Sequence, residues 1–159
     1  MELKELKREN SNQILQVYSA LKNLNIEYPN FKKWFFAKIV PGIADGTRRI
    51  FVALDGDVFA AILILKDSDE KKICTLRVSD NYRNEGLGTQ LLDLACKELC
   101  TAFPLVTVPE SHFLEFVRLF SKYHFQLTKT YPDYYRKNSI EYCFNGLLNE
   151  KIASENHCA

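Results

Sequence analysis

The chain lacks the features that mark specialised classes of protein. It has no internal repeat, no low-complexity segment and no run of one charge. Its formal net charge is only +1, with 21 basic and 20 acidic residues, which argues against an electrostatic surface for nucleic acid or membrane. The longest apolar runs, such as residues 58–65, are far too short to span a bilayer. What remains is a globular composition, 47% apolar and 13% aromatic, with the length of one domain.

Metal-ligating residue types are also scarce. The chain has only three histidines, and its five cysteines form no C-x-x-C pair, so we expect no metal site. The odd set of thiols and the lack of a signal peptide favour a reducing compartment, and we expect a cytoplasmic protein.

The first third of the chain has helical periodicity. Residues 2–7 fit a strand as well as a helix. Apolar residues between 14 and 24 share one helical face, and residues 31–39 carry a second, aromatic stripe. We expect Pro41 and Gly42 to close this second helix. Core packing is favoured for the stripe over a substrate pocket or a partner surface.

The middle of the chain is rich in β-forming residues. Residues 49–54 and 58–65 flank Asp55-Gly56-Asp57, which is a strong hairpin signal, and a third strand is expected over residues 72–78. A helix from about 88 to 100 then leads to a short strand at residues 105–108. This strand–helix–strand unit makes the two strands parallel.

The last third predicts a further helix and two strands. Ser111 is a candidate N-cap for a helix that runs through Phe120. Strands are expected near residues 125–131 and 141–144. We expect residues 1–148 to form one domain and residues 149–159 to be a frayed tail.

One segment combines these elements into a possible anion site. The strand that ends at Val78 feeds a polar connection with Arg83, Gly86 and Gly88, and an amphipathic helix follows at once. Glycines at a helix N-terminus let main-chain N–H groups reach a phosphate, and the helix dipole adds positive potential. Leu91 stands where a dinucleotide-binding motif needs a third glycine, and no Lys-Ser/Thr pair forms a P-loop. The alternative is a tight strand-to-helix turn without a ligand.

This R-x-x-G-x-G segment resembles the CoA-binding segment of the GNAT (Gcn5-related N-acetyltransferase) superfamily, whose pattern is R/Q-x-x-G-x-G/A after a strand. Residues 76–78 and 81–88 match it in order, and the element order from about 10 to 146 also fits. The resemblance places a first strand at residues 2–7. It implies an α/β fold with a mixed sheet of six or seven strands, mostly antiparallel with a central splayed parallel pair, flanked by about four helices.

The resemblance implies acetyl-CoA as co-substrate and no metal. Main-chain N–H groups from Asn84 to Thr89 would hold its pyrophosphate, and the pantetheine would pair with the strand near Leu76 and Val78. Arg83 would lie beside the phosphates, or pair with Asp80 as a surface residue. The residues implied for CoA binding are Leu76, Val78, Arg83, Asn84, Glu85, Gly86, Leu87, Gly88, Thr89 and Phe120. Thr89 has two readings, as a phosphate ligand or as a helix cap.

The chemistry implied is direct attack of an amine on the thioester, with an N–H of the splayed strand stabilising the oxyanion. The family commonly has a tyrosine, in a segment like L-Y-x-K-x-G-F, that protonates the leaving thiolate. Residues 119–125 read L-F-S-K-Y-H-F, so Phe120 stands at the tyrosine position and has no proton to give. Tyr123 is the remaining acid candidate. The candidate bases are Glu110, His112 and His124, and the sequence does not rank them.

Three functions follow from this reading. The leading hypothesis is an N-acetyltransferase that forms a ternary complex with acetyl-CoA and a primary amine. The second is a CoA-binding module without turnover, motivated by Phe120. The third is an interaction domain that uses the aromatic stripe. The acceptor stays open among small amines, antibiotics, peptides, lysine side chains and aminoacyl-tRNA. Acceptor specificity would lie in the first two helices and in residues 128–138, whose tyrosines are favoured as a rim or a homodimer contact.

Overall fold

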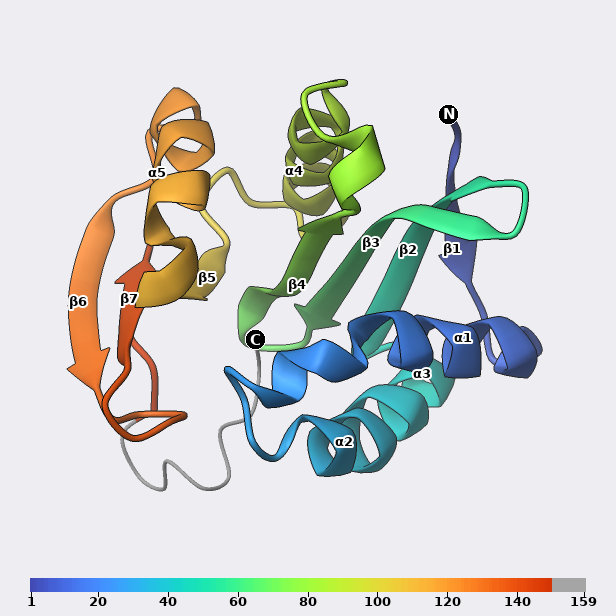
Figure 1. Cartoon of the computed structure of the whole chain (residues 1–159), viewed down its shortest axis with the longest axis horizontal. Coiled ribbons are helices and arrows are strands. Elements are labelled where there is room, and N and C mark those ends of the chain that lie inside the picture. The colour runs from blue at the N-terminus through green and yellow to red at the C-terminus, as the bar shows by residue number, and fades with distance from the viewer. Residues whose placement is uncertain (150–159) are drawn as a thin grey trace.

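The computed structural model describes residues 1–149, and its centre is one mixed sheet of seven strands (Figure 1). The strand order is β1-β2-β3-β4-β5-β7-β6. The strands are β1 (Leu3–Leu6), β2 (Arg48–Asp55), β3 (Val58–Asp67), β4 (Lys71–Val78), β5 (Leu105–Pro109), β6 (Leu127–Pro132) and β7 (Ile140–Phe144). Only β4 and β5 are parallel, and every other neighbouring pair is antiparallel. The expected fold class is therefore confirmed, including a first strand within residues 2–7.

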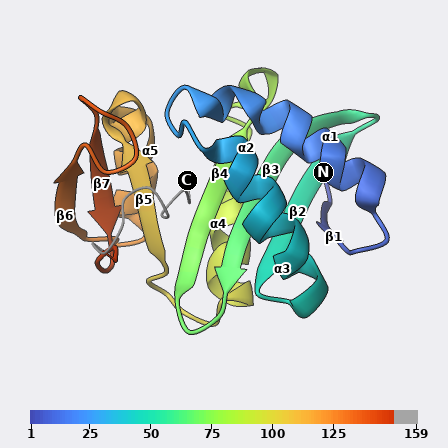
Figure 2. The same ribbon diagram turned by 90° about the horizontal axis from the view of Figure 1, so that it is seen from below.

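Helices cover both faces of the sheet. They are α1 (Ser11–Leu21), α2 (Phe31–Trp34), α3 (Val40–Asp45), α4 (Leu87–Glu98) and α5 (Phe113–Lys122). Figure 2 shows α1, α2 and α3 on one face of β2–β4 and α4 on the other. One buried cluster lies under α1–α3, and a second joins α4 and α5 to the sheet. No helix within residues 1–149 is long and apolar enough to cross a membrane.

The aromatic stripe of residues 31–39 belongs to the core. Phe31, Trp34, Phe35 and Ile39 are all buried against α1 and the sheet. Core packing is thereby confirmed, and the use of this stripe as an interaction surface is wrong, because those four side chains are not accessible to a partner.

Pro41 does not close the second helix, which continues to Asp45 and ends at Gly46 with φ of 81°. Proline lacks an N–H and normally clashes with the carbonyl four residues back. Here a π-helical turn at Phe35–Ile39 comes just before Pro41, and the Val40 N–H donates to the Phe35 carbonyl five residues back. The wider turn rearranges the backbone at the proline, so the helical path goes on.

Two expectations for the last third of the chain were wrong. Ser111 is not the cap of α5, because it lies in a 3₁₀ turn at Glu110–His112 and its Oγ donates to Glu27 Oε1 at 2.9 Å. Of the tyrosines of residues 128–138, expected at a rim or dimer contact, Tyr131 and Tyr134 are instead buried in a small cluster with Leu105 and Cys143 inside the chain, and Tyr135 is half-buried. Of the expected tail, residues 150–159 lie outside the described residues, and Asn149 accepts a hydrogen bond from Tyr134.

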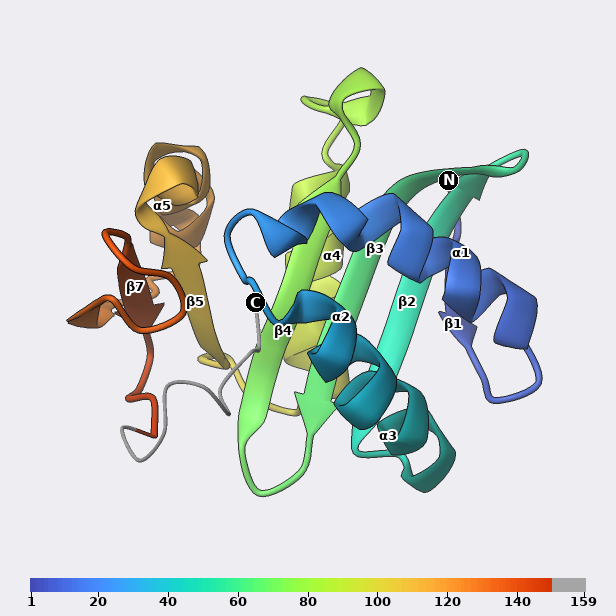
Figure 3. The same cartoon turned by 60° about the horizontal axis from the view of Figure 1, so that its bottom comes forward.

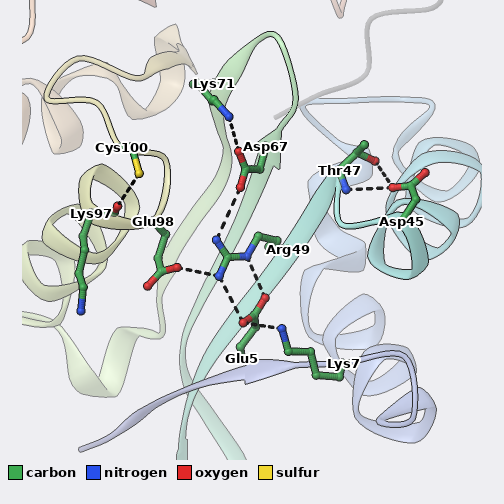
Figure 4. Close-up of polar contacts among 10 residues, drawn as sticks. All are labelled: Glu5, Lys7, Asp45, Thr47, Arg49, Asp67, Lys71, Lys97, Glu98 and Cys100. Carbon is green, nitrogen blue, oxygen red and sulfur yellow. Dashed lines mark hydrogen bonds and ion pairs between the residues drawn. The ribbon is translucent and has the colours of Figure 1, made fainter.

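An arginine joins the first half of the sheet to α4 (Figure 4). Arg49 on β2 lies 2.9 Å from Glu5 Oε1 on β1, 2.7 Å from Glu98 Oε2 on α4 and 3.6 Å from Asp67 Oδ2 on β3. Burial opposes ionisation of Glu5, but hydrogen bonds from Arg49 and Lys7 outweigh it and lower the pKa of that carboxyl. This network ties three strands to the helix that carries the glycine loop.

The parallel pair separates soon after it forms. β4 and β5 pair only at Lys72–Leu105 and Ile73–Val106, whereas β4 stays paired with β3 as far as Val78. Figure 3 shows the two strands diverging, with the segment between α1 and α2 near the gap. The expected splayed pair is thus present, and it creates the site described next.

Candidate functional site

A cleft of about 670 Å³ lies where β4 and β5 separate. Its walls are β4 from Ile73 to Val78 and β5 from Val106 to Pro109. Leu87, Gly88 and Phe120 line it from the α4–α5 side, and Glu27 and Tyr28 line it from the α1–α2 side. Because both faces contribute, the cleft passes through the sheet.

The loop before α4 has the backbone geometry of an anion site. Asn84 and Gly86 both have positive φ, 63° and 81°, and Gly86 is the N-cap residue of α4. Left-handed Gly86 followed by the right-handed first turn of α4 turns successive N–H groups towards one point, and the first N–H groups of α4 add their partial charge. No side chain caps this helix end, so Thr89 is not the cap. The loop can hold a diphosphate through its main chain.

The residues implied for CoA binding surround this loop but do not all face the cleft. Seven of these ten residues line the cleft, namely Leu76, Val78, Arg83, Asn84, Leu87, Gly88 and the buried Phe120. Glu85, Gly86 and Thr89 are exposed next to the lining residues. The loop and the strand end therefore lie on one continuous surface.

Arg83 is at the mouth of the cleft with its side chain 47% exposed. Its Nη2 lies 3.0 Å from Asp80 Oδ1 and 3.3 Å from Glu115 Oε1 on α5. Exposed ion pairs of this kind contribute little to stability and exchange partners readily. The guanidinium can therefore serve a phosphate without a large energetic cost.

The structure separates the candidate acid and bases. His112 lines the cleft, and its Nδ1 lies 3.1 Å from Glu115 Oε2. Glu110 is exposed, and its Oε1 accepts a hydrogen bond from the Ile140 N–H at 3.0 Å. His124 follows α5 with φ of 57°. Of the candidate bases only His112 contacts the cleft.

Tyr123 does not line the cleft. Its hydroxyl donates to Asp93 on α4 and lies 3.2 Å from the Thr89 carbonyl. Partial burial and this carboxylate raise the pKa of Tyr123. Phe120, at the position of the family tyrosine, is 1% exposed and packs its ring against Phe116, Phe125 and Phe144. We see no acidic hydroxyl at the α5 wall of the cleft among the residues the structure describes.

The opposite end of the cleft contains residues that the sequence analysis did not identify. Glu27 and Tyr28 lie in the break between α1 and α2. Glu27 Oε2 lies 3.4 Å from Arg136 Nη2, and the Tyr28 hydroxyl donates to Glu141 Oε1 at 2.9 Å. The sequence did offer one indication of these residues, a Glu-Tyr-Pro sequence that follows the first helix. The family resemblance assigned acceptor specificity to this region.

Glu141 is a buried carboxyl on β7, only 3% exposed. Loss of water raises its pKa to about 7, although hydrogen bonding and the charge of Lys72 oppose the shift. In the sequence, the burial of Glu141 is indicated only by its position inside a short apolar strand. Its state of ionisation changes in the range where enzymes usually work.

The raised pKa of Glu141 makes stability depend on pH. Because the folded-state pKa of about 7 exceeds the usual 4.5, this group favours folding most at low pH and loses that contribution as pH rises through 7. The total loss is about 3 kcal/mol. Glu141→Gln carries no charge at any pH and should not show this loss. The free energy of unfolding of the variant minus that of the wild type, from urea titrations, should therefore rise between about pH 5 and about pH 8 by most of this amount. The same stability difference between variant and wild type at both pH values would contradict a raised pKa of Glu141.

No group of three or more His, Cys, Asp or Glu side chains within residues 1–149 is arranged to hold a metal ion. The four cysteines in that part of the chain form no disulfide.

Comparisons with known proteins give one family and one fold. The model of the acetyltransferase (GNAT) family matches residues 13–102. Ard1 from Thermoplasma volcanium is 19% identical, with a TM-score of 0.68 over 94% of this chain and 98% of that one. An aminoglycoside 6'-N-acetyltransferase complexed with coenzyme A is 14% identical, with a TM-score of 0.67 over 91% and 95%. A GNAT family acetyltransferase from Elizabethkingia anophelis with acetyl-CoA bound is 16% identical, with a TM-score of 0.52 over 62% and 75%. A search of curated protein sequences found no match.

Proposed function

Because the chain belongs to the acetyltransferase (GNAT) family, we propose that it transfers an acetyl group from acetyl-CoA to a primary amine in a ternary complex. The observation that carries this proposal is the cleft through the sheet. It presents the glycine loop before α4 towards one face and an acidic, tyrosine-containing wall towards the other. We also propose that residues 1–148 act as one domain in the cytoplasm, in keeping with four cysteines that form no disulfide.

The main chain of the glycine loop supports acetyl-CoA as the donor. The N–H groups after Gly86 and the Arg83 guanidinium would hold the diphosphate, and the β4 edge from Cys74 to Val78 would align the pantetheine. Two of the solved structures similar to this chain hold coenzyme A or acetyl-CoA. Acetyl-CoA supplies the activated acetyl thioester, and the protein supplies position.

Most of the rate would come from that positioning. An amine entering from the α1–α2 side would meet the thioester between β4 and β5, where main-chain N–H groups no longer pair across the two strands. Such an N–H can stabilise the oxyanion that develops on the carbonyl. Holding two reactants in line accounts for a large part of the barrier reduction in reactions of this type.

The test is release of free thiol from acetyl-CoA in the presence of an amine. We expect thiol and N-acetylated product in equal amounts with at least one amine from a panel of spermidine, kanamycin and a peptide with a free N-terminus. The product should be identified by mass spectrometry, because thiol release without acetylated amine would show only hydrolysis. Hydrolysis alone, with every amine left unmodified, would contradict the proposal.

A second candidate function, a CoA-binding module without turnover, is favoured by Phe120. The buried ring offers no proton to a leaving thiolate. A thiolate is, however, a tolerable leaving group near neutral pH, so the absent hydroxyl does not forbid transfer. A thermal shift with acetyl-CoA, combined with no thiol release from any amine of the panel, would favour the module.

A further inference from the structure

The acceptor end of the cleft contains a buried polar pair that no expected catalytic residue explains. The Tyr28 side chain lines the cleft, and its hydroxyl donates to Glu141 Oε1 at 2.9 Å. Glu141 is on β7 behind the cleft wall, opposite Pro109 in the ladder with β5. A buried carboxylate costs free energy unless a partner compensates for the loss of water, so its presence here calls for an explanation.

The surroundings of this pair indicate a ligand. Thr75 on β4 also lines the cleft, and its hydroxyl is buried without a hydrogen-bond partner within the described part of the chain. Buried hydroxyls are almost always satisfied in folded proteins, so an unsatisfied one in a cleft wall requires an explanation. A polar group of a substrate between β4 and Tyr28 would provide a partner.

We propose that Tyr28 and Glu141 form the path by which the acceptor ammonium loses its proton, with Tyr28 in contact with the amine and Glu141 as the final proton acceptor. This inference rests on the proposed function. It deepens that function by assigning the base, which the sequence left open among Glu110, His112 and His124.

The proton and electron balance is complete. The ammonium N–H proton passes to Tyr28 Oη as the phenolic proton passes to Glu141 Oε1, so Tyr28 stays neutral and Glu141 becomes the neutral acid. The amine lone pair then forms the C–N bond, and the C–S bond breaks. The thiolate takes the second nitrogen proton to give the free thiol, and Glu141 later returns its proton to water.

Each element around Glu141 contributes a group that affects its protonation. Lys72 on β4 favours the carboxylate by its charge, and Glu27 disfavours it. Tyr28 donates a hydrogen bond that favours the carboxylate, and Cys143 is the neighbouring titratable side chain on β7. Burial, followed by the nearby Glu141, raises the pKa of Tyr28 well above its usual range. The phenol therefore stays protonated and passes protons on without accumulating charge.

The experiment compares pH profiles of kcat/KM with whichever amine of the panel is acetylated. The wild type should lose activity at low pH as Glu141 becomes protonated. Glu141→Gln keeps the acceptor oxygen for Tyr28 and the side-chain shape, yet it should lower kcat/KM about 100-fold or more and remove the acid limb. Tyr28→Phe keeps the ring against Tyr135, at 5.0 Å between centroids, and should cause a similar loss. Both variants should keep the full thermal shift with acetyl-CoA.

The matched control is Glu70→Gln, which removes an exposed carboxylate that pairs with Lys66 outside the cleft and should leave the profile unchanged. An acid limb that survives in Glu141→Gln but disappears in Glu110→Gln or His112→Gln would overturn the inference while leaving the acetyltransferase intact. Full activity in Tyr28→Phe would overturn it as well. If no amine is acetylated by the wild type, the proposed function itself fails.

Discussion

Replacement of Gly88 or Gly86 by valine is expected to abolish the thermal stabilisation of the protein by acetyl-CoA. At about 100 times Kd, the wild type should gain about 2.7 kcal/mol, or about 5–10 °C in Tm. Gly88 lines the cleft in the first turn of α4, and an added Cβ would meet only Leu119 Cδ2 at 3.5 Å. Gly88→Val should therefore fold normally and block the main chain from the phosphates.

Gly86→Val needs a matched control because Gly86 has φ of 81°, which strains any side chain. Gly56, in the β2–β3 hairpin, has φ of 59° and equally open surroundings but does not line the cleft. Both valine variants should lose about 1–2 kcal/mol of stability from strain. Only Gly86→Val should also lose the response to acetyl-CoA. A full response in Gly86→Val and Gly88→Val would show that the phosphates bind elsewhere.

Phe31→Ala should be among the most destabilising single changes in this protein. Phe31 is fully buried, and its ring lies 5.5 Å from that of Trp34 and 6.1 Å from that of Tyr18, measured between centroids. Truncation of a buried phenylalanine costs about 3–5 kcal/mol. Its N–H donates to the Tyr28 carbonyl at 2.9 Å, so the loosened loop should also raise KM for the amine. Urea unfolding and steady-state kinetics measure the two effects.

Phe103→Ala is the control for this change, because Phe103 is 54% exposed. Its free energy of unfolding should stay within about 0.5 kcal/mol of the wild type. Phe31→Ala should keep the acetyl-CoA response, since the glycine loop packs on the other face of the sheet. Equal costs for the two alanine variants would mean that the aromatic cluster is not the core of this face.

The sequence predicted the elements whose signals are local. Alternating β-branched residues around Asp55-Gly56-Asp57 indicate a hairpin, and the strand before the paired glycines indicates a helix start with free N–H groups. The resemblance supplied the first strand within residues 2–7 and the splay between β4 and β5. These features depend on short-range periodicity or on a motif, which a single sequence displays directly.

The features that the sequence did not predict depend on contacts between distant segments. Tyr28 and Glu141 are 113 residues apart, and only the pairing of β5 with β7 brings them together. The π-helical turn before Pro41 lets the helix continue past the proline, and helix propensity scales do not include such an adjustment of the backbone. Tyr123 has the right chemistry at a nearby position, but the direction of its side chain depends on the packing of α5 against α4.

The short ladder between β4 and β5 has a mechanical consequence. With two rungs, at Lys72–Leu105 and Ile73–Val106, the joint resists bending far less than the long ladders on either side of it. Contacts outside the ladder therefore hold the segment from β5 onward at its distance from β4, among them the hydrogen bonds of Tyr28 with Glu141 and of Ser111 with Glu27. The width of the opening thus depends on side chains of the segment between α1 and α2, and substitution of Glu27 or Tyr28 should alter it.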